Sequence, residues 1–304
     1  MLEIGLFQVR YYGLMYVFAF IISFYLVLFR IKKENRFNVS KEQMANLSTC
    51  LIAGVLVGGR LGYVLFYNLS YYTLHPLEIF LPFEFTNQIT FTGISGMSYH
   101  GGLVGVIISA WLYIRKTGLD YWEIADLMAP VIPLGYTLGR LGNFINGELF
   151  GRITTQPIGM YFPLTGSMEL RHPSQLYEAL FEGLFLFIIL WNIRFKDLPK
   201  GAMLAVYLIG YGTIRFFIEF FRQPDPGIGF VIGTFTMGQA LCCVMIICGI
   251  VLYQYLYRRF KMMITTVSHK LENFGVTFYN VLYIRLWLIL DAVFIYASID
   301  KMLH

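Results

Sequence analysis

The sequence predicts an all-α polytopic membrane protein, and three observations carry this prediction. Hydrophobic residues make up 57% of the chain and charged residues only 13%, whereas about a quarter of the residues in soluble domains are charged. The mean hydropathy is +0.63. Apolar stretches also recur at about the 20 residues that a helix needs to cross a bilayer. These values exclude an ordinary soluble globular fold.

Seven apolar stretches are long enough to be transmembrane helices. The predicted spans are residues 11–30, 46–67, 99–116, 121–140, 173–194, 201–219 and 236–257. The first run lacks a basic leader and a small-residue cleavage site, so we expect it to remain as a span. A further apolar run, 276–298, contains Arg285 and Asp291. It is predicted either to cross the membrane as an eighth span or to lie on its surface.

The cationic residues predict how the chain is oriented. Lys and Arg cluster after the first, third, fifth and seventh spans, whereas the connection 68–98 contains neither. By the positive-inside rule, the N-terminus lies outside and the seventh span ends in the cytoplasm. We therefore expect a multi-pass protein of the bacterial cytoplasmic (inner) membrane, with its longest connections on the outer face.

Two of these outer connections have compositions of their own. Residues 68–98 mix aromatic residues with prolines and two acids, which predicts an arm lying in the membrane interface. Residues 141–172 are rich in glycine and proline, which predicts a small external head with short strands. We thus predict a seven-span domain over 1–260 and a C-terminal extension of unknown role over 261–304.

The segment from Gly139 to Arg152 is the strongest candidate for a functional site. It combines two arginines, two asparagines and one carboxylate with four glycines, directly after an apolar run: Arg140, Arg152, Asn143, Asn146, Glu148, Gly139, Gly142, Gly147 and Gly151. Polar groups near hydrocarbon are costly unless they pair or face water, and guanidinium groups suit a phosphate or carboxylate. The alternative is that the arginines anchor a helix end and the glycines permit helix packing. That alternative leaves the asparagines and Glu148 unexplained.

Further polar residues lie in or beside the apolar spans. His100 opens the third span and has a side chain suited to proton transfer, although it could equally be a structural helix-start residue. Asp126 lies inside the fourth span, about 21 Å along a helix from Arg140, so we expect it to pair elsewhere. Tyr211, Arg215 and Glu219 share one helical stripe, where Arg215 either binds an anion or satisfies Glu219.

Other patterns are read as structural. Glycines recur at helix-contact spacing, at Gly54, Gly58, Gly62, Gly101 and Gly105, and permit close helix packing. The four cysteines fall inside apolar runs without metal-ligand spacing. The sequence contains no Gly-x-Ser-x-Gly elbow, His-Glu-x-x-His pair or phosphate-binding loop. Ordinary serine hydrolase, zinc protease and ATPase activities therefore have no motif support.

These motifs together resemble the bacterial prolipoprotein diacylglyceryl transferases, in colinear order over about residues 8–260. The resemblance rests on the segments Tyr12–Tyr16, His100–Gly102, Gly139–Arg152, His172–Glu178 and Tyr211–Asp225. It implies seven spans with an outward-facing site, in agreement with the charge pattern. It also implies transfer of the sn-1,2-diacylglyceryl group of phosphatidylglycerol to the lipobox cysteine of a prolipoprotein, which releases glycerol-1-phosphate.

The resemblance also assigns expected roles to individual residues. Arg140 and Arg215 would bind the phosphate and glycerol headgroup, and His100 would act as the base. The expected substrate-binding residues are Tyr12, Asp126, Asn143, Asn146, Glu148, Gly151, Tyr211 and Glu219. The partners it implies are phosphatidylglycerol, prolipoprotein signal peptides with a lipobox cysteine, and membrane lipids. It implies no metal, no cofactor and no nucleic acid.

Two other classes of protein compete with this interpretation. A carrier for an anionic solute would need broken helices and polar groups near the bilayer centre, whereas the polar groups here gather toward one face. A purely structural assembly protein would not need the arginine cluster. The extension after residue 260 is the one departure from the family pattern.

Overall fold

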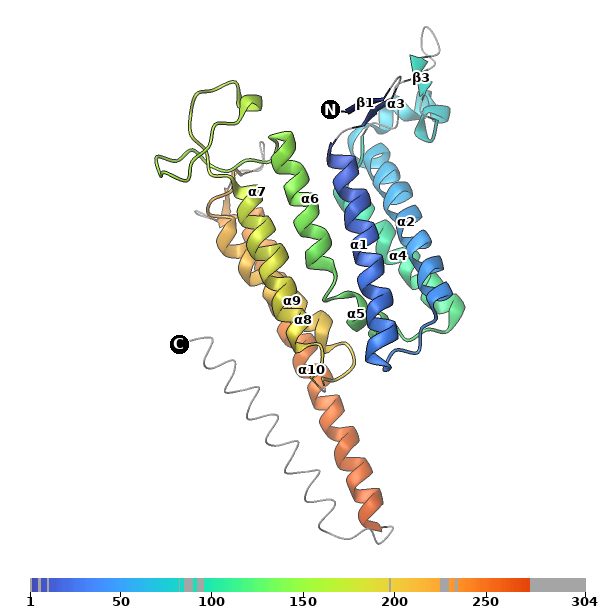
Figure 1. Cartoon of the computed structure of the whole chain (residues 1–304). Helices are drawn as coiled ribbons and strands as arrows, with labels where there is room; N and C mark the ends of the chain where they lie inside the picture. The colour runs from blue at the N-terminus through green and yellow to red at the C-terminus, as the bar shows by residue number, and fades with distance from the viewer. Residues whose placement is uncertain are drawn as a thin grey trace. The chain divides into compact units, whose positions relative to one another are not determined.

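The computed structural model describes residues 2–4, 7–9, 11–81, 83–84, 90–91, 96–196, 198–224, 230–232 and 235–273. The chain divides into two compact units, residues 1–249 and 250–304. The first unit is mostly helical (Figure 1). The apolar run 276–298 lies outside the described residues, so its predicted alternatives stay open.

The elements follow one another along the chain with short connections. The helices are α1 (Tyr11–Glu34), α2 (Lys41–Tyr67), α3 (Leu69–Leu74), α4 (Tyr99–Thr117), α5 (Tyr121–Met128), α6 (Ile132–Asn146), α7 (Ser174–Tyr177), α8 (Leu186–Ile193), α9 (Ala202–Ile218) and α10 (Met237–Asn273). A π-helical segment, η3 (Glu178–Phe185), joins α7 to α8, and two 3₁₀ turns are η1 (Pro76–Ile79) and η2 (Pro163–Thr165). Three antiparallel pairs are β1 (Leu2–Ile4) with β2 (Phe7–Val9), β3 (Phe83–Glu84) with β4 (Thr90–Phe91), and β5 (Phe230–Ile232) with β6 (Phe235–Thr236).

Within the described residues, four helical segments are both long and apolar enough to cross a membrane. They are Gly13–Glu34, Lys41–Tyr67, Ser174–Ile193 and Met237–Thr266, and Ala202–Ile218 is a shorter apolar helix. An all-α membrane protein is therefore confirmed. The third predicted span coincides with α4. The fourth, predicted as 121–140, differs from the prediction because it is divided between α5 and α6.

Proline explains the break between α5 and α6. Pro130 has no N–H to donate to the Asp126 carbonyl, four residues earlier. The N–H of Val131 donates to Met128 O at 2.8 Å, which leaves Leu127 O without its helical donor. Arg30 of α1 replaces both donors, since its Nη1 donates to the carbonyls of Asp126 and Leu127. A fully buried arginine thus stabilises the end of α5.

Helices α2 and α4 pack together along their glycines, as predicted. A Cβ added to Gly105 would lie 2.1 Å from Gly54 O, and one added to Gly58 would lie 2.4 Å from Gly101 O. Only glycine allows two backbones to approach so closely. The predicted structural role of these glycines is confirmed.

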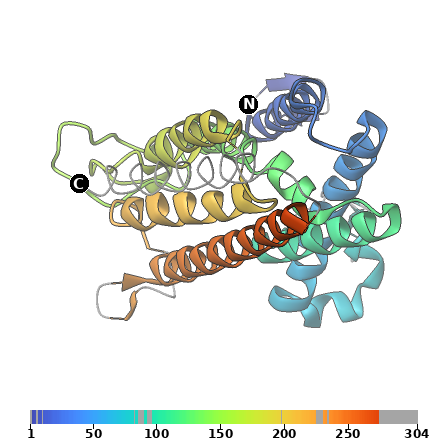
Figure 2. The ribbon, with the colours of Figure 1, turned by 90° about the horizontal axis from the view of Figure 1, so that it is seen from below.

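The remaining helices of the first unit form a bundle around α6. Helix α6 packs against α1 on one side and against η3 on the other, where Thr137 Oγ1 donates to Ala179 O at 3.3 Å. Figure 2 shows η3, α9 and the first half of α10 side by side. Gly212 of α9 contacts Cys242 and Ile246 of α10. These contacts bring residues far apart in sequence to one end of the bundle.

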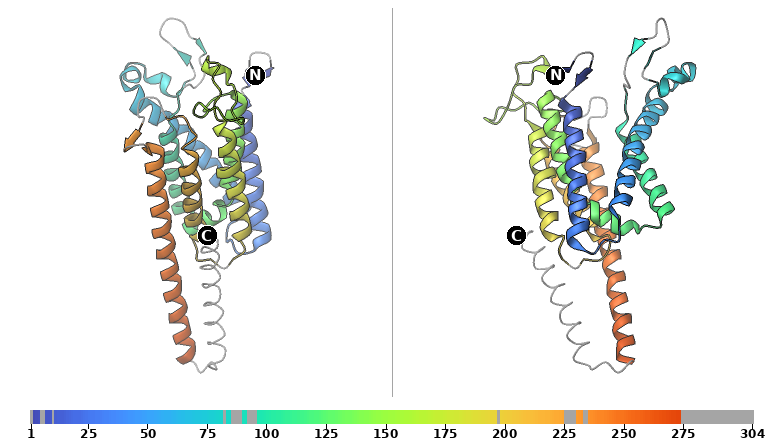
Figure 3. Two further views of the ribbon diagram at one scale, coloured as in Figure 1. Left: turned by 90° about the vertical axis from the view of Figure 1, so that its left-hand side faces the viewer. Right: turned by 45° about the vertical axis from the view of Figure 1, so that its right-hand side comes forward.

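The arm and the head lie at the same end of the helices as the β1–β2 hairpin (Figure 3). The first part of the arm is fixed by Arg60 of α2, which donates to Ile79 O and Glu78 O, both at 2.6 Å. The predicted short strands in the head are wrong for the described residues 141–172. That segment contains only isolated bridges, such as Ile153 with Arg171, because its glycines and prolines interrupt every ladder after one pair.

Candidate functional site

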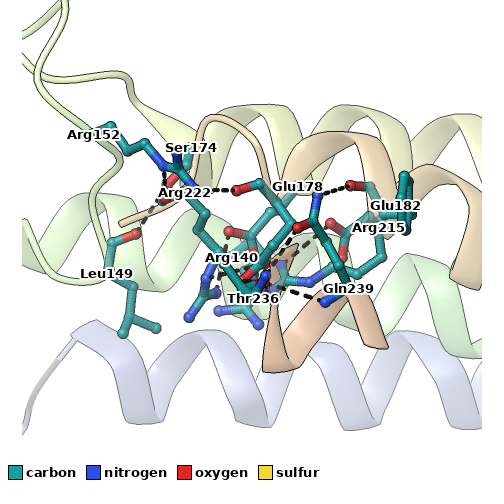
Figure 4. Close-up of polar contacts among 12 residues, drawn as sticks. Arg140, Leu149, Arg152, Ser174, Glu178, Glu182, Arg215, Arg222, Thr236 and Gln239 are labelled. Atoms are coloured by element: carbon teal, nitrogen blue, oxygen red, sulfur yellow. Dashed lines mark hydrogen bonds and ion pairs between the residues drawn. The ribbon is translucent and has the colours of Figure 1, made fainter. Parts of the chain in front are cut away.

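A fully buried carboxylate, Glu178, lies at the centre of the candidate site (Figure 4). Its Oε2 is 2.9 Å from Arg140 Nε and 3.0 Å from Arg215 Nη1, and its Oε1 is 3.4 Å from Arg222 Nη1. The arginines come from α6, from α9 and from the segment after α9. Three separate parts of the chain therefore meet at one carboxylate.

Glu219 forms a second junction on the same arginines. Its Oε2 is 3.0 Å from Arg215 Nη2 and 3.8 Å from Arg222 Nε. Its Oε1 accepts a hydrogen bond of 3.0 Å from Thr236 Oγ1. Thr236 in turn exchanges hydrogen bonds with Gln239 in the first turn of α10. Helix α10 is thereby tied to the end of α9.

Tyr136 and Glu182 lie behind Glu178, deeper in the helices. The Tyr136 hydroxyl is 2.6 Å from Glu182 Oε2 and 3.0 Å from Glu178 Oε2. The Arg140 guanidinium lies over the Tyr136 ring, 4.7 Å from its centroid. The ring of Tyr211 packs edge-on against the same tyrosine at 5.8 Å.

The wide turn of η3 suits this arrangement. Glu178 and Glu182 both belong to η3, and both reach the same tyrosine of α6. Single π-helical turns inside helices are rare and frequently occur at functional sites. Here the turn directs two carboxylates of one helix toward a single hydroxyl.

The end of α6 carries the predicted asparagine and glutamate residues. Arg140 Nη1 donates to Asn143 Oδ1 at 3.1 Å, and Asn143 Nδ2 donates to Glu148 Oε1 at 2.9 Å. Asn146 Nδ2 reaches the same Glu148 oxygen at 3.4 Å. Gly147 ends the helix with a φ of +71°, a conformation that glycine adopts without strain. This chain of hydrogen bonds orients Arg140 from its own helix.

Gly151 joins the head to the cluster. It pairs with Arg222 in an isolated bridge, and its N–H donates to His172 O at 2.8 Å. A Cβ at this position would lie 2.4 Å from Phe221 O, so only glycine fits. Arg152 Nε donates to Arg222 O at 2.8 Å. Burial lowers the pKa of the neighbouring His172 imidazole.

The negative charges of this site are more deeply buried than the positive charges. The side chains of Glu178 and Glu182 have no exposed surface, whereas those of Arg140, Arg215 and Arg222 are 19%, 13% and 14% exposed. Guanidinium groups therefore lie between the carboxylates and the surface. An anion that approaches from outside meets N–H donors before it meets negative charge, and it meets them where water is scarce and electrostatic attraction is strong.

Most of the predicted site residues come together here. The cluster and its hydrogen-bonded neighbours include Arg140, Arg215, Asn143, Asn146, Glu148, Gly151, Tyr211 and Glu219. His100 lies exposed in the first turn of α4, the helix that packs on α2. Tyr12 lies in the first turn of α1, and its side chain falls outside the described residues.

Asp126 lies away from this cluster, at the start of α9, so its expected substrate-binding role stays a prediction. Its carboxylate accepts hydrogen bonds from Gly201 N at 2.7 Å and Met203 N at 3.0 Å, at the start of α9. Arg215 lies 14 residues further along that helix, or roughly 21 Å at 1.5 Å per residue. Gly201 has no side chain to cap the helix, so Asp126 supplies the cap from α5.

Sequence reasoning did not select Glu178, Glu182, Tyr136 or Arg222 as site residues. A signal for the two glutamates was present, since they stand one turn apart in an apolar span where each needs a cation or a proton. Tyr136 gave no signal, because a tyrosine in an apolar helix is ordinary core. Within the described residues, no group of three His, Cys, Asp or Glu side chains could hold a metal ion.

The fold and the site define a class of protein before any comparison is made. Apolar helices form the bundle, and a layer of arginines at one end covers buried carboxylates. This arrangement is typical of a membrane protein that binds an anionic group at the edge of its apolar helices.

Comparison with known proteins then identifies the family. Residues 1–255 match the prolipoprotein diacylglyceryl transferase family, so this chain belongs to it. A phosphatidylglycerol–prolipoprotein diacylglyceryl transferase from Chlorobaculum tepidum is 53% identical over 243 residues, 80% of this chain and 84% of the relative. Similarly named proteins from Bordetella avium and Desulfotalea psychrophila are 46% and 45% identical, covering 85% and 83% of this chain and 94% and 90% of the relatives. The resemblance found in the sequence is confirmed.

Proposed function

We propose that this chain transfers the diacylglyceryl group of phosphatidylglycerol to the lipobox cysteine of prolipoproteins, the first step of bacterial lipoprotein maturation. The family membership supports this activity. The observation that carries it in the structure is Glu178, a buried carboxylate that gathers three arginines from separate segments. All three arginine side chains are also partly exposed, as the binding of an anion from outside requires.

In this proposal the arginines bind the lipid phosphate. Arg140 and Arg215 each keep part of the guanidinium near the surface while Glu178 fixes it from behind. A guanidinium has five N–H donors, and the glutamates and Asn143 do not use all of them, so the remaining donors can bind phosphate oxygens. Asn143, Asn146 and Glu148 orient Arg140 from the end of α6. Glu219 does the same for Arg215.

The reaction is a substitution at carbon. The cysteine sulfur attacks C3 of the diacylglyceryl group, a C–S bond forms, and the C3–O bond to phosphate breaks. The bonding electron pair leaves with the phosphate as glycerol-1-phosphate, and the thiol proton passes to a base. Because the leaving phosphate gains charge as the C–O bond breaks, arginines placed against it stabilise the transition state more than the ground state.

His100 remains the proposed base for the thiol. A thiol near pKa 8.5 is a poor nucleophile until it ionises, and imidazole accepts protons near neutral pH. His100 lies exposed in the first turn of α4. His100→Gln should therefore slow transfer at neutral pH. Raised pH should restore much of that rate, because the thiol then ionises without a base. A rate that stayed normal at neutral pH, or a loss that raised pH did not relieve, would give His100 a structural role instead.

We further propose seven spans in the cytoplasmic membrane, with the N-terminus and the arginine cluster facing outward. The basic connections alternate along the chain with the arm and the head, which supports this orientation. Residues 1–260 then form the transferase domain, with the arm 68–98 and the head 141–172 beside the outer leaflet. The extension 261–304 has no assigned role.

The decisive experiment is a transfer assay with defined substrates. Purified protein in micelles containing phosphatidylglycerol is incubated with a synthetic lipobox peptide, and glycerol phosphate release and peptide mass are followed. We expect a diacylglyceryl adduct that depends on the peptide cysteine, with a Cys→Ala peptide as the control. A folded protein that binds the lipid without forming this product would contradict the proposal.

A further inference from the structure

The Tyr136 hydroxyl lies between two fully buried carboxylates. Its oxygen is 2.6 Å from Glu182 Oε2 and 3.0 Å from Glu178 Oε2. A tyrosine hydroxyl carries a single hydrogen and can donate to only one of them. If both glutamates were ionised, one of these contacts would bring two oxygen lone pairs together without a proton between them.

The distribution of cations shows which carboxylate requires a proton. Glu178 contacts three arginines, two of them at 3.0 Å or less. Among the cations of the described residues, Glu182 forms an ion pair with Arg215 alone, at 3.4 Å. That contact uses Nη1, the same nitrogen that lies 3.0 Å from Glu178. A buried charge without a cation of its own is costly, and a carboxyl group in that position favours its neutral form.

We propose that Glu182 carries a proton before substrate binds, and that a chain of two hydrogen bonds through Tyr136 connects this proton to Glu178. The Glu182 Oε2–H donates to Tyr136 Oη, and Tyr136 donates to Glu178 Oε2. Every short contact then contains a hydrogen. The titratable and charged groups near Glu182 are Tyr136 and Arg140 from α6, Arg215 and Tyr211 from α9, Cys242 from α10 and Glu178 from its own helix. A neutral Glu182 is compatible with all of them, since Arg140 and Arg215 keep the ionised Glu178 as their partner.

The proton sets the charge of the site. Arg140, Arg215 and Arg222 contribute three positive charges, against ionised Glu178 and Glu219. With Glu182 neutral the cluster carries one positive charge, and with Glu182 ionised it carries none. A lipid phosphodiester has one negative charge, so the neutral form of Glu182 matches the site to that ligand. This consequence rests on the proposed function, whereas the proton itself does not.

Infrared spectroscopy of the wild-type protein and its variants in lipid bilayers tests the proton directly. At neutral pH we expect a carbonyl stretch from a protonated carboxylic acid that disappears in Glu182→Gln and remains in Glu219→Gln. In Tyr136→Phe the band should persist at a shifted frequency, because Glu182 loses its acceptor. This variant also keeps the test valid if Glu182→Gln fails to fold. Absence of the band from wild-type protein, or its loss in Glu219→Gln alone, would overturn the proposal.

Transfer assays of the glutamine variants separate this inference from the proposed function. Glutamine resembles a neutral glutamate, so Glu182→Gln should keep activity within about tenfold, whereas Glu178→Gln should lose about a hundredfold or more, because it unpairs buried arginines. Equal losses in both variants would show that Glu182 acts as a charge and would contradict the inference. A wild-type protein with the infrared band but without transfer would instead refute the proposed function.

Discussion

The molecule contains two arginine clusters, each built around a buried glutamate, at opposite ends of its helices. At one end Glu178 contacts Arg140, Arg215 and Arg222. At the other end Glu34 contacts Arg30 at 2.7 Å, Arg36 at 2.9 Å and Arg194 at 3.3 Å. The residue types are the same, so their surroundings must explain any difference in role.

The difference lies in what else the arginines bind. Arg30 has no exposed surface and donates to backbone carbonyls at the end of α5, while Arg194 lies over the Trp191 ring at 3.8 Å. Arg30 and Arg194 therefore stabilise the fold. In the Glu178 cluster the arginines contact carboxylates behind them and keep partial exposure in front. In the Glu34 cluster Arg36 is exposed, but Arg30 and Arg194 are buried. An arginine cluster therefore indicates a binding site where all of its arginines are partly exposed.

The largest expected effect separates the two clusters by activity. Arg140→Ala should reduce transfer by about a thousandfold, because it removes donors that stabilise the leaving phosphate. The protein should still fold, since Glu178 keeps Arg215 and Arg222. The measurement is product formation per folded protein, with melting temperature recorded in the same detergent.

The matched control removes a positive charge from the other end. Lys33 is exposed at the end of α1, and Lys33→Ala should leave transfer unchanged. Near-normal activity in the Arg140 variant would contradict the assignment of this arginine to the phosphate.

The second prediction concerns the Glu34 cluster. Arg30→Met should cost about 3 kcal/mol of unfolding free energy, because it breaks a buried ion pair and leaves two carbonyls without donors. Activity per folded molecule should stay close to that of the wild type. Denaturant unfolding in detergent provides the measurement. A variant that kept its stability but lost transfer would place Arg30 in the site instead.

Sequence alone predicted the helical membrane fold, and it located much of the site because both depend on local chemistry. Apolar runs predict transmembrane spans, and polar residues beside glycines predict a candidate site. Arg140, Asn143 and Glu148, which were predicted in this way, are hydrogen-bonded to one another. The break after α5 was missed although Pro130 is a local signal for it, whereas its stabilisation by Arg30, 96 residues away, is visible only in the structure. Tyr136 was missed because only tertiary packing places its hydroxyl between two carboxylates.

The third prediction tests whether Asp126 caps α9 or binds substrate. Asp126→Ala should cost about 1 kcal/mol of stability, the usual effect of losing a helix cap, and should leave transfer per folded molecule unchanged. Asp126→Asn should recover part of the loss, because its amide oxygen still accepts one hydrogen bond. Unfolding midpoints and transfer rates of both variants are compared. A loss of transfer without a loss of stability would support the substrate-binding role.

The smallest effect is expected at an exposed ion pair near the Glu34 end. Lys200 Nζ lies 3.0 Å from Asp120 Oδ2. Burial opposes the charge on Asp120, but hydrogen bonds from Lys200 and from Trp122 N–H outweigh it and lower the pKa of Asp120. The hydrogen bond with Asp120 raises the pKa of Lys200. An acid whose pKa is lower in the folded state than in the unfolded state stabilises the fold at any pH above its unfolded-state pKa. This stabilisation is lost as the pH falls through the folded-state pKa.

Lys200→Met should therefore cost about 0.3 kcal/mol at neutral pH, since exposed pairs contribute little. The cost should vanish in acid, where Asp120 is protonated in both states, and it should shrink with added salt. Melting temperatures of the two proteins across a pH series measure the difference. If Lys200→Met remained less stable than the wild type in acid, Lys200 would stabilise the loop before α9 by packing its alkyl chain. The difference in stability between exposed and buried ion pairs would then rest on the Arg30 variant alone.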